Sequence, residues 1–103
     1  MPVTVTVERH IAPGTQQQVK ALLGQLWQMA KTHPGHISGR TLVDAFNPGI
    51  ILTISEWTDL AARERWEKDP ECVRVVKTIN ALLAKTTPIR VWVQDDDAPP
   101  PAV

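Results

Sequence analysis

The chain has 103 residues, a formal net charge of zero at pH 7 and 43% hydrophobic residues. This length allows one domain with a single core. Because 11 basic residues balance 11 acidic ones, we expect no nucleic-acid partner, which would require a basic surface. No apolar stretch approaches the roughly 20 residues that cross a bilayer, and no signal-peptide pattern is found, so we expect no membrane contact. A single cysteine, Cys72, agrees with the reducing cytoplasm.

The first two predicted elements are a strand and a long helix. Valines alternate with polar residues over positions 3–8, which is the period-two pattern of a strand with one buried face. Pro13-Gly14 interrupts this strand, and Thr15 is placed to cap the helix that follows. From Gln16 to about His33 the apolar residues recur at helical spacing, and Pro34-Gly35 ends the helix.

Two further strands are predicted to form a hairpin. The first runs from about Ile37 to Phe46, and the second from Ile50 to Trp57. Asn47-Pro48-Gly49 between them is typical of a turn. The two strands are therefore expected to pair antiparallel.

The second helical region is predicted to consist of two pieces. Thr58 or Asp59 can cap a short helix that starts directly after Trp57 and ends near Lys68. Pro70 suits the first turn of a new helix. That helix is marked by an apolar stripe made of Cys72, Val75, Val76, Ile79, Leu82 and Leu83. A last strand is predicted from Ile89 to Gln94, and the acidic, proline-rich tail, residues 95–103, is expected to be poorly ordered outside a domain of residues 1–94.

The order of these elements, β-α-β-β-α-β, is the ferredoxin-like split arrangement of the α+β class, with an antiparallel sheet. Helices would cover one face of the sheet. The other face would expose isoleucine, valine and tryptophan side chains, a surface that a lone domain rarely leaves open. Pairing with a second copy about a two-fold axis would bury it, so we predict a homodimer.

One set of residues joins the third strand to the helices: Glu56-Trp57-Thr58-Asp59, Ala61, Trp66 and Asp69-Pro70. These residues resemble the motif of the antibiotic biosynthesis monooxygenase (ABM) domain, and the resemblance covers roughly residues 2–94. It implies a dimeric α+β barrel. The family holds quinone-forming oxygenases, haem-degrading enzymes and many members without an assigned role.

The resemblance carries over to single residues in two branches of the family. In the quinone-forming branch, Trp57 matches the strand-end tryptophan, Thr53 occupies the position of an asparagine, and Arg63 stands where that branch has a tyrosine. In the haem-degrading branch only Trp66 is retained. The histidine that binds haem in that branch would fall near Val76, where this chain has no histidine. The resemblance therefore disfavours haem cleavage.

A candidate site follows from these residues and from the chemistry of oxygen. Oxygen reacts slowly with closed-shell organic molecules unless they lose an electron easily, as a polyphenol anion does without flavin or metal. The protein would then supply a dry pocket, a hydrogen-bond donor and a base or cation. We predict a site with Trp57, Thr53 and His10 as catalytic residues and with Trp66, Ser55, Phe46, Arg63 and Leu23 as substrate-binding residues. Arg40 and Arg90 are further polar candidates.

Each assignment has a plainer alternative. Trp66 is more simply a core residue than a pocket wall, and for Trp57 the two interpretations are equally balanced. His33 and His36 flank a helix stop without the spacing of metal ligands, so they are expected to be solvated loop residues, and no metal site is predicted.

Three functions remain open at this level. The first is a cofactor-independent monooxygenase that acts with oxygen on a small aromatic or quinol-like compound. The second is a non-catalytic small-molecule-binding or stress-response dimer that uses the same pocket. The third is an assembly protein whose pocket is filled by side chains. An open cavity beside Trp57 would favour the first two.

Overall fold

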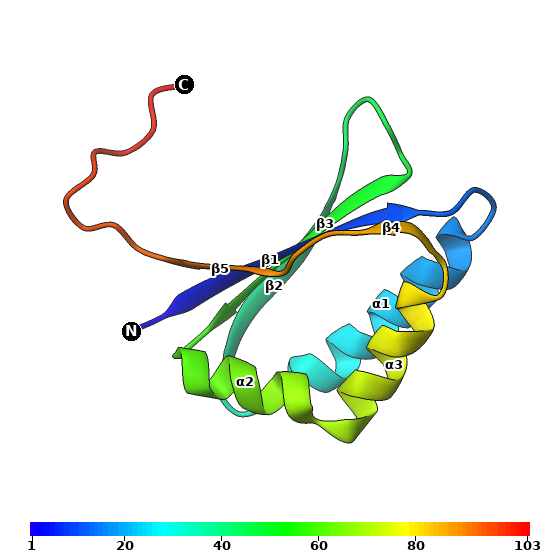
Figure 1. Ribbon diagram of the computed structural model, residues 1–103. Helices are drawn as coiled ribbons and strands as arrows, with labels where there is room; N and C mark the ends of the chain where they lie inside the picture. Colours follow the sequence, from blue (N-terminus) through cyan, green and yellow to red (C-terminus); the bar gives the residue numbers. More distant parts are fainter.

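The computed structural model describes residues 1–103 as an antiparallel five-stranded sheet with three helices on one side of it (Figure 1). The elements in chain order are β1 (Val3–Ile11), α1 (Gln16–Ala30), β2 (His36–Val43), β3 (Ile50–Trp57), α2 (Leu60–Lys68), α3 (Pro70–Asn80), β4 (Leu83–Thr86) and β5 (Arg90–Val93).

The strands lie in the order β2-β3-β1-β4, and β5 also pairs with β1. The two central strands, β1 and β3, pair along their whole length, from Val3 opposite Trp57 to His10 opposite Ile50. The predicted α+β class, the antiparallel sheet and the split β-α-β-β-α-β order are confirmed. One difference is that the last strand comes in two pieces along the same edge of β1.

The third helix ends earlier than predicted. It stops at Asn80, and Leu83–Thr86 forms β4 where the apolar stripe predicted helix. Leu83 pairs with Ile11 at an irregularity in the register, and Leu82 donates its N–H to the carbonyl of Ile79 in a tight turn. A pair of leucines satisfies either a helix face or a buried turn, so periodicity alone does not separate the two.

Two aspartates fix the broken helical region. Asp59 accepts a hydrogen bond of 2.8 Å from the N–H of Ala62, and Asp69 accepts one of 2.9 Å from the N–H of Glu71. Each carboxylate satisfies a free N–H of the first helical turn. The cap predicted for Thr15 is wrong in detail, because its hydroxyl donates to the carbonyls of Ala12 and Leu82 instead of accepting from α1.

The core lies between the helices and one face of the sheet. The odd-numbered residues of β1 and β3 point to this inner face, because successive side chains of a strand alternate. Val5, Ile51 and Trp57 are each 1% exposed there. The same alternation places Thr53 and Ser55 on the inner face, next to the helices.

The opposite face of the sheet is open in the single chain. Leu42 and Trp92 lie on it and are 42% and 48% exposed. The indole of Trp92 donates to the hydroxyl of Thr6 over 2.8 Å. This matches the uncovered apolar face expected from the sequence, while its pairing with a second copy stays a prediction.

The remaining features concern the ends and the helices. After β5 the chain forms neither helix nor strand, and residues 94–103 lead away from the body of the molecule (Figure 1). None of the three helices has the length and apolarity needed to traverse a bilayer.

Candidate functional site

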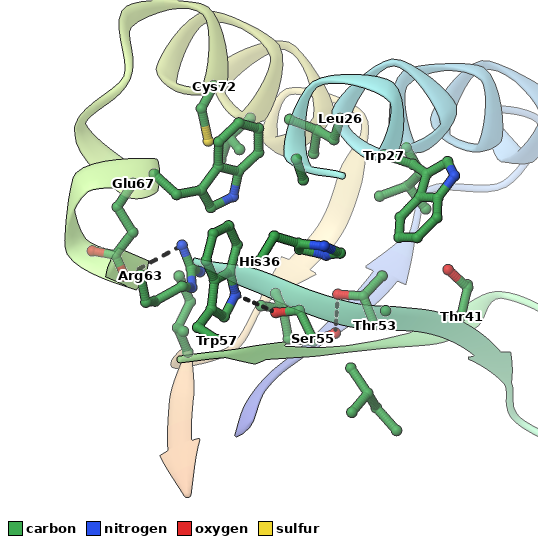
Figure 2. A pocket seen from close by; sticks show the side chains of 18 of the residues that line it. Leu26, Trp27, His36, Thr41, Thr53, Ser55, Trp57, Arg63, Glu67 and Cys72 are labelled. Carbon is green, nitrogen blue, oxygen red and sulfur yellow. Dashed lines mark hydrogen bonds and ion pairs between the residues drawn. The ribbon is translucent and has the colours of Figure 1, made fainter. Parts of the chain in front are cut away.

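A cavity of about 430 Å³ lies between the inner face of the sheet and the helices (Figure 2). Twenty residues, mostly from the sheet and from α1, α2 and α3, surround it, and eleven of them are hydrophobic. Small-molecule sites in proteins are mostly apolar hollows of about 300–1,000 Å³ with a few polar groups. The cavity has the size and the lining of such a site.

Two tryptophans form one wall of the cavity. Trp57 ends β3 and Trp66 lies on α2, and their rings stack at 6.1 Å between centroids with an angle of 23°. The direct passage from strand to helix after Trp57 brings them together. Because Trp57 is 1% and Trp66 7% exposed, both belong to the core as well as to the cavity wall.

A third tryptophan, Trp27 on α1, closes another part of the cavity (Figure 2). Its ring passes close to β2, where a Cβ atom added to Gly39 would lie 3.1 Å from the indole. The absence of a side chain at Gly39 therefore lets this indole lie against the strand.

The indole nitrogen of Trp57 is already bonded inside the protein. It donates to the hydroxyl of Ser55 over 3.1 Å (Figure 2). This bond fixes the orientation of the ring, because the ring can no longer turn without leaving a buried donor unpaired. Trp57 therefore offers a ligand its ring surface, and Ser55 holds that ring in place.

The two histidines beside Pro34-Gly35 are half-buried, so the expectation of solvated loop residues is wrong. His33 lies edge-on to Trp66 at 5.4 Å, and His36 lies edge-on to Trp57 at 5.1 Å. The turn is held against the junction of β3 and α2, since Thr58 donates its N–H to the carbonyl of Gly35 over 2.8 Å. Burial lowers the pKa of His36, which lines the cavity as a neutral imidazole at pH 7.

Arg9 is a buried cation at the cavity wall. It stands on the inner face of β1 and is 7% exposed. Its Nη1 donates to the Thr53 hydroxyl over 3.1 Å, and its Nε is buried without a hydrogen-bond partner. Burial, and next the charge of Arg63, lower the pKa of Arg9. No carboxylate neutralises this guanidinium.

Arg63 on α2 is a second buried cation of the same cavity, also 7% exposed. Its nearest carboxylate is Glu67, 3.6 Å away and itself 43% exposed (Figure 2). The Nε of Arg63 has no hydrogen-bond partner, and burial lowers its pKa. Burial also raises the pKa of the nearby Cys72 thiol to about 11, so Cys72 supplies no negative charge at pH 7.

The sequence of the chain matches the family model described as antibiotic biosynthesis monooxygenase over residues 2–78. The chain belongs to this family. Among curated protein sequences no match is found.

Several solved structures share the fold of this chain. A conserved protein from Methanosarcina mazei Go1 superposes with a TM-score of 0.88 at 18% identity, covering 92% of this chain and 94% of its own. Rv0793 from Mycobacterium tuberculosis gives 0.85 at 18% identity, with 96% and 100% covered. A mutant of SnoaB, a cofactor-independent oxygenase from Streptomyces nogalater, gives 0.84 at 17% identity, with 95% and 97% covered. At these identities the likeness shows the fold.

Most residues that the sequence singled out for an ABM site meet in the cavity. The residues brought together there are Thr53, Ser55, Trp57, Arg63, Trp66 and Leu23. Arg40 borders the cavity, but it is exposed and pairs with Ile54, so its side chain points to the outer face; Arg90 lies over the ring of Trp92 on that same face.

Two predicted site residues of this ABM chain lie elsewhere. His10 is an even-numbered residue of β1, so it points to the opposite face, where its Nε2 lies 2.7 Å from the Glu8 carboxylate. Phe46 is 97% exposed in the connection between β2 and β3. The structure therefore does not bring His10 or Phe46 into the cavity.

The cavity residues not assigned to the site from the sequence include Arg9, Trp27 and His36. A signal for Arg9 was present, because it continues the apolar register of the first strand between Val7 and Ile11. A charged residue in such a register is buried by its neighbours. Trp27 and His36 carried no comparable signal. A tryptophan in the apolar stripe of a helix and a histidine after a turn are both common without any role in a site.

Proposed function

We propose that this protein is a cofactor-independent monooxygenase of the ABM type, acting with molecular oxygen on a small aromatic or quinol-like substrate. The observation that carries the proposal is the cavity itself. It presents the stacked rings of Trp57 and Trp66 next to the unneutralised guanidinium of Arg9. Flat rings favour an aromatic guest, and the cation favours the electron-rich anion of that guest.

The proposed reaction needs no external reductant. A phenol anion passes one electron to oxygen, and the resulting pair combines to form a carbon–oxygen bond. The O–O bond of this peroxide then breaks. One oxygen atom stays on the ring as a quinone carbonyl, and the other leaves as water with the hydrogen of that carbon and the phenolic proton. The substrate thus supplies all four electrons that reduce one oxygen molecule.

The side chains of the cavity have separate roles in this proposal. The indoles of Trp57 and Trp66 hold the ring and exclude water, which strengthens every charge interaction inside. Arg9 stabilises the anion, and Thr53 orients Arg9 through their hydrogen bond. His36 is the neutral base of the cavity, available to accept the phenolic proton.

Oxygen consumption tests this function. We expect a panel of naphthols and hydroquinones to include a compound whose oxidation consumes oxygen faster with the protein than without it. Trp57→Phe is expected to slow the reaction by about tenfold or more, because the ring loses its fixed position. Trp92→Phe, the same change outside the cavity, is expected to leave the rate unchanged. The absence of uptake across the panel overturns the proposal.

We further propose a homodimer built on the open face of the sheet. Leu42 and Trp92 are exposed there, and burying such a face stabilises a pair of copies. Sedimentation at micromolar concentration is expected to give a dimer for the native chain and a monomer for Leu42→Asp. Val73→Asp, on the outer surface of α3 where Val73 is 50% exposed, serves as the matched control and is expected to remain dimeric. A monomeric native chain contradicts this part.

A second candidate function uses the same cavity for binding alone. The core-like burial of Trp57 and its internal bond to Ser55 favour it, since a rigid wall serves a binding module equally well. Aromatic compounds would then quench tryptophan fluorescence without any oxygen uptake. For either function we propose the cytoplasm as the compartment, in keeping with the free thiol of Cys72.

A further inference from the structure

We propose that Arg9 and Arg63 form an anion-binding site in the cavity, and that the ligand is an aromatic molecule carrying an acidic oxygen group, a carboxylate or a phenolate. This inference rests on the proposed function only for the aromatic part of the ligand. The anionic part follows from the charges around the cavity.

Those charges do not balance within the protein. Arg9 has one neutral partner, the Thr53 hydroxyl at 3.1 Å, whereas Arg63 forms an ion pair of 3.6 Å with the partly exposed carboxylate of Glu67. Both side chains are 7% exposed, and both Nε atoms are buried without a partner. Buried charges are ordinarily paired, because a lone ion loses its hydration without compensation. Two buried guanidinium groups share a single carboxylate at this cavity, and the excess positive charge indicates a missing anion.

The other titratable groups around the cavity do not supply that anion. Cys72 stays a neutral thiol at pH 7, and His36 is a neutral imidazole. Arg40 borders the cavity but is exposed and pairs with Ile54 of the outer face, so its guanidinium points away from the ligand. Glu67 alone is acidic; it lines the cavity, pairs with Arg63 and is 43% exposed, so it offsets one of the two buried positive charges. The cavity is therefore positive overall, and a neutral ligand would leave it so.

Guanidinium groups fit this task by their shape as well as by their charge. Each presents several N–H groups in one plane, which match the oxygens of a carboxylate or a phenolate. The indoles of Trp57 and Trp66 lie at the same cavity. The rings would cover the apolar part of the ligand while the arginines hold its acidic end.

The binding of two matched probes tests the proposal. Binding is measured by the quenching of tryptophan fluorescence. The carboxylate probe is 2-naphthoate, and its neutral match is 2-naphthamide. We expect the naphthoate to bind about tenfold or more tightly, as charge-assisted hydrogen bonds would require. The phenolate probe is 2-naphthol, whose ionised form is identified by its absorbance. We expect bound naphthol to ionise at lower pH than free naphthol.

Variants assign the effect to the two arginines. Arg9→Met and Arg63→Met are each expected to reduce the preference for naphthoate over naphthamide to about threefold or less, while naphthamide itself still binds. Arg9→Lys keeps the charge and is expected to retain part of the preference. Arg74→Met, a change on the exposed surface of α3, is expected to leave the preference intact.

The outcomes separate this inference from the oxygenase proposal. A charge preference in either probe that disappears in Arg9→Met supports the site and identifies the acidic group, even when no compound causes oxygen uptake. Equal binding of naphthoate and naphthamide together with unshifted ionisation of naphthol overturns it, even when neutral compounds are oxidised. A preference that survives both Arg9→Met and Arg63→Met overturns it as well.

Discussion

The guanidinium of Arg9 on β1 donates to the hydroxyl of Thr53 on β3 over 3.1 Å. The two residues share the inner face of the sheet, where Val7 is the direct partner of Thr53 and Arg9 is the next inward residue of β1. A full positive charge thus meets a neutral hydroxyl inside the fold. Burying an unpaired positive charge lowers the stability of the folded chain unless an anion, such as a bound ligand, pairs with it.

Removal of this charge is expected to stabilise the protein. Arg9→Met keeps the length of the side chain and removes an unpaired buried cation, so we expect the free energy of unfolding to rise by about 1–3 kcal/mol. Urea denaturation measures it. Arg74→Met is the surface control, expected to change stability by less than about 0.5 kcal/mol. A destabilised Arg9→Met protein would show that Arg9 has a structural role.

Gly35 is expected to tolerate no side chain. Its φ is +90°, and an added Cβ would overlap the side chain of Ala62 and lie 2.9 Å from the Thr58 hydroxyl. Gly35→Ala should therefore lower the free energy of unfolding by about 2–4 kcal/mol, from the left-handed backbone and the overlap together.

Gly24 provides the opposite case within the same chain. It lies in α1, and nothing stands within 4 Å of an added Cβ. Gly24→Ala is expected to raise the free energy of unfolding by about 0.5–1 kcal/mol, because alanine loses less conformational freedom in a helix. Thermal unfolding of both variants measures the contrast, and similar effects of the two substitutions would contradict it.

The stability of the protein is expected to fall on acidification, partly through His36. Burial lowers the pKa of His36 in the folded state, so the unfolded chain binds more protons as the pH drops. The contribution is fully present above the unfolded pKa of about 6.5 and is lost as the pH falls through the folded pKa. Urea midpoints of the native chain should decrease more steeply below pH 6.5 than those of His36→Gln. Parallel curves would exclude this role.

The thiol of Cys72 is expected to be unreactive in the folded protein. It is 4% exposed, and burial raises its pKa to about 11. The thiolate is the reactive form, so a disulfide reagent at pH 8 should react far more slowly with the native chain than with glutathione. Unfolding in denaturant should restore the full rate. Rapid reaction of the native chain would show that the cavity opens at this wall.

Removal of the tail is expected to leave the domain unchanged. The hydrogen bonds of the tail are local, such as those from the N–H of Ala98 to the carbonyl of Asp95 and from the N–H of Asp97 to the Asp95 carboxylate. A chain that ends at Gln94 should therefore keep the same urea midpoint and the same oligomeric state. A lower midpoint would assign the tail a place in the fold.

Much of the fold could be predicted from the sequence because its signals are local. The alternation of valines in β1, the break at Pro34-Gly35, the cap at Asp59 and the helix start at Pro70 each depend on near neighbours. The end of α3 was misplaced because Leu83 joins a strand through its pairing with Ile11, a contact distant in sequence.

The site could be predicted only in part, for the same reason. The inner face of β3 places Thr53, Ser55 and Trp57 in the cavity, where the sequence analysis expected a site. His10 could not be assigned to a face until the register was known, and one residue of shift reverses every side chain. The alternation of β1 placed Arg9 on the same face as the valines, but the cavity above that face depends on what packs there, which sequence spacing does not provide.

The most direct test of the central claim is a crystal structure of the protein with 2-naphthoate. We predict the naphthalene rings against Trp57 and Trp66, with the carboxylate on the guanidinium groups of Arg9 and Arg63. Naphthoate found on the outer face of the sheet, or a cavity closed by its own side chains while the ligand stays in solution, would contradict the account.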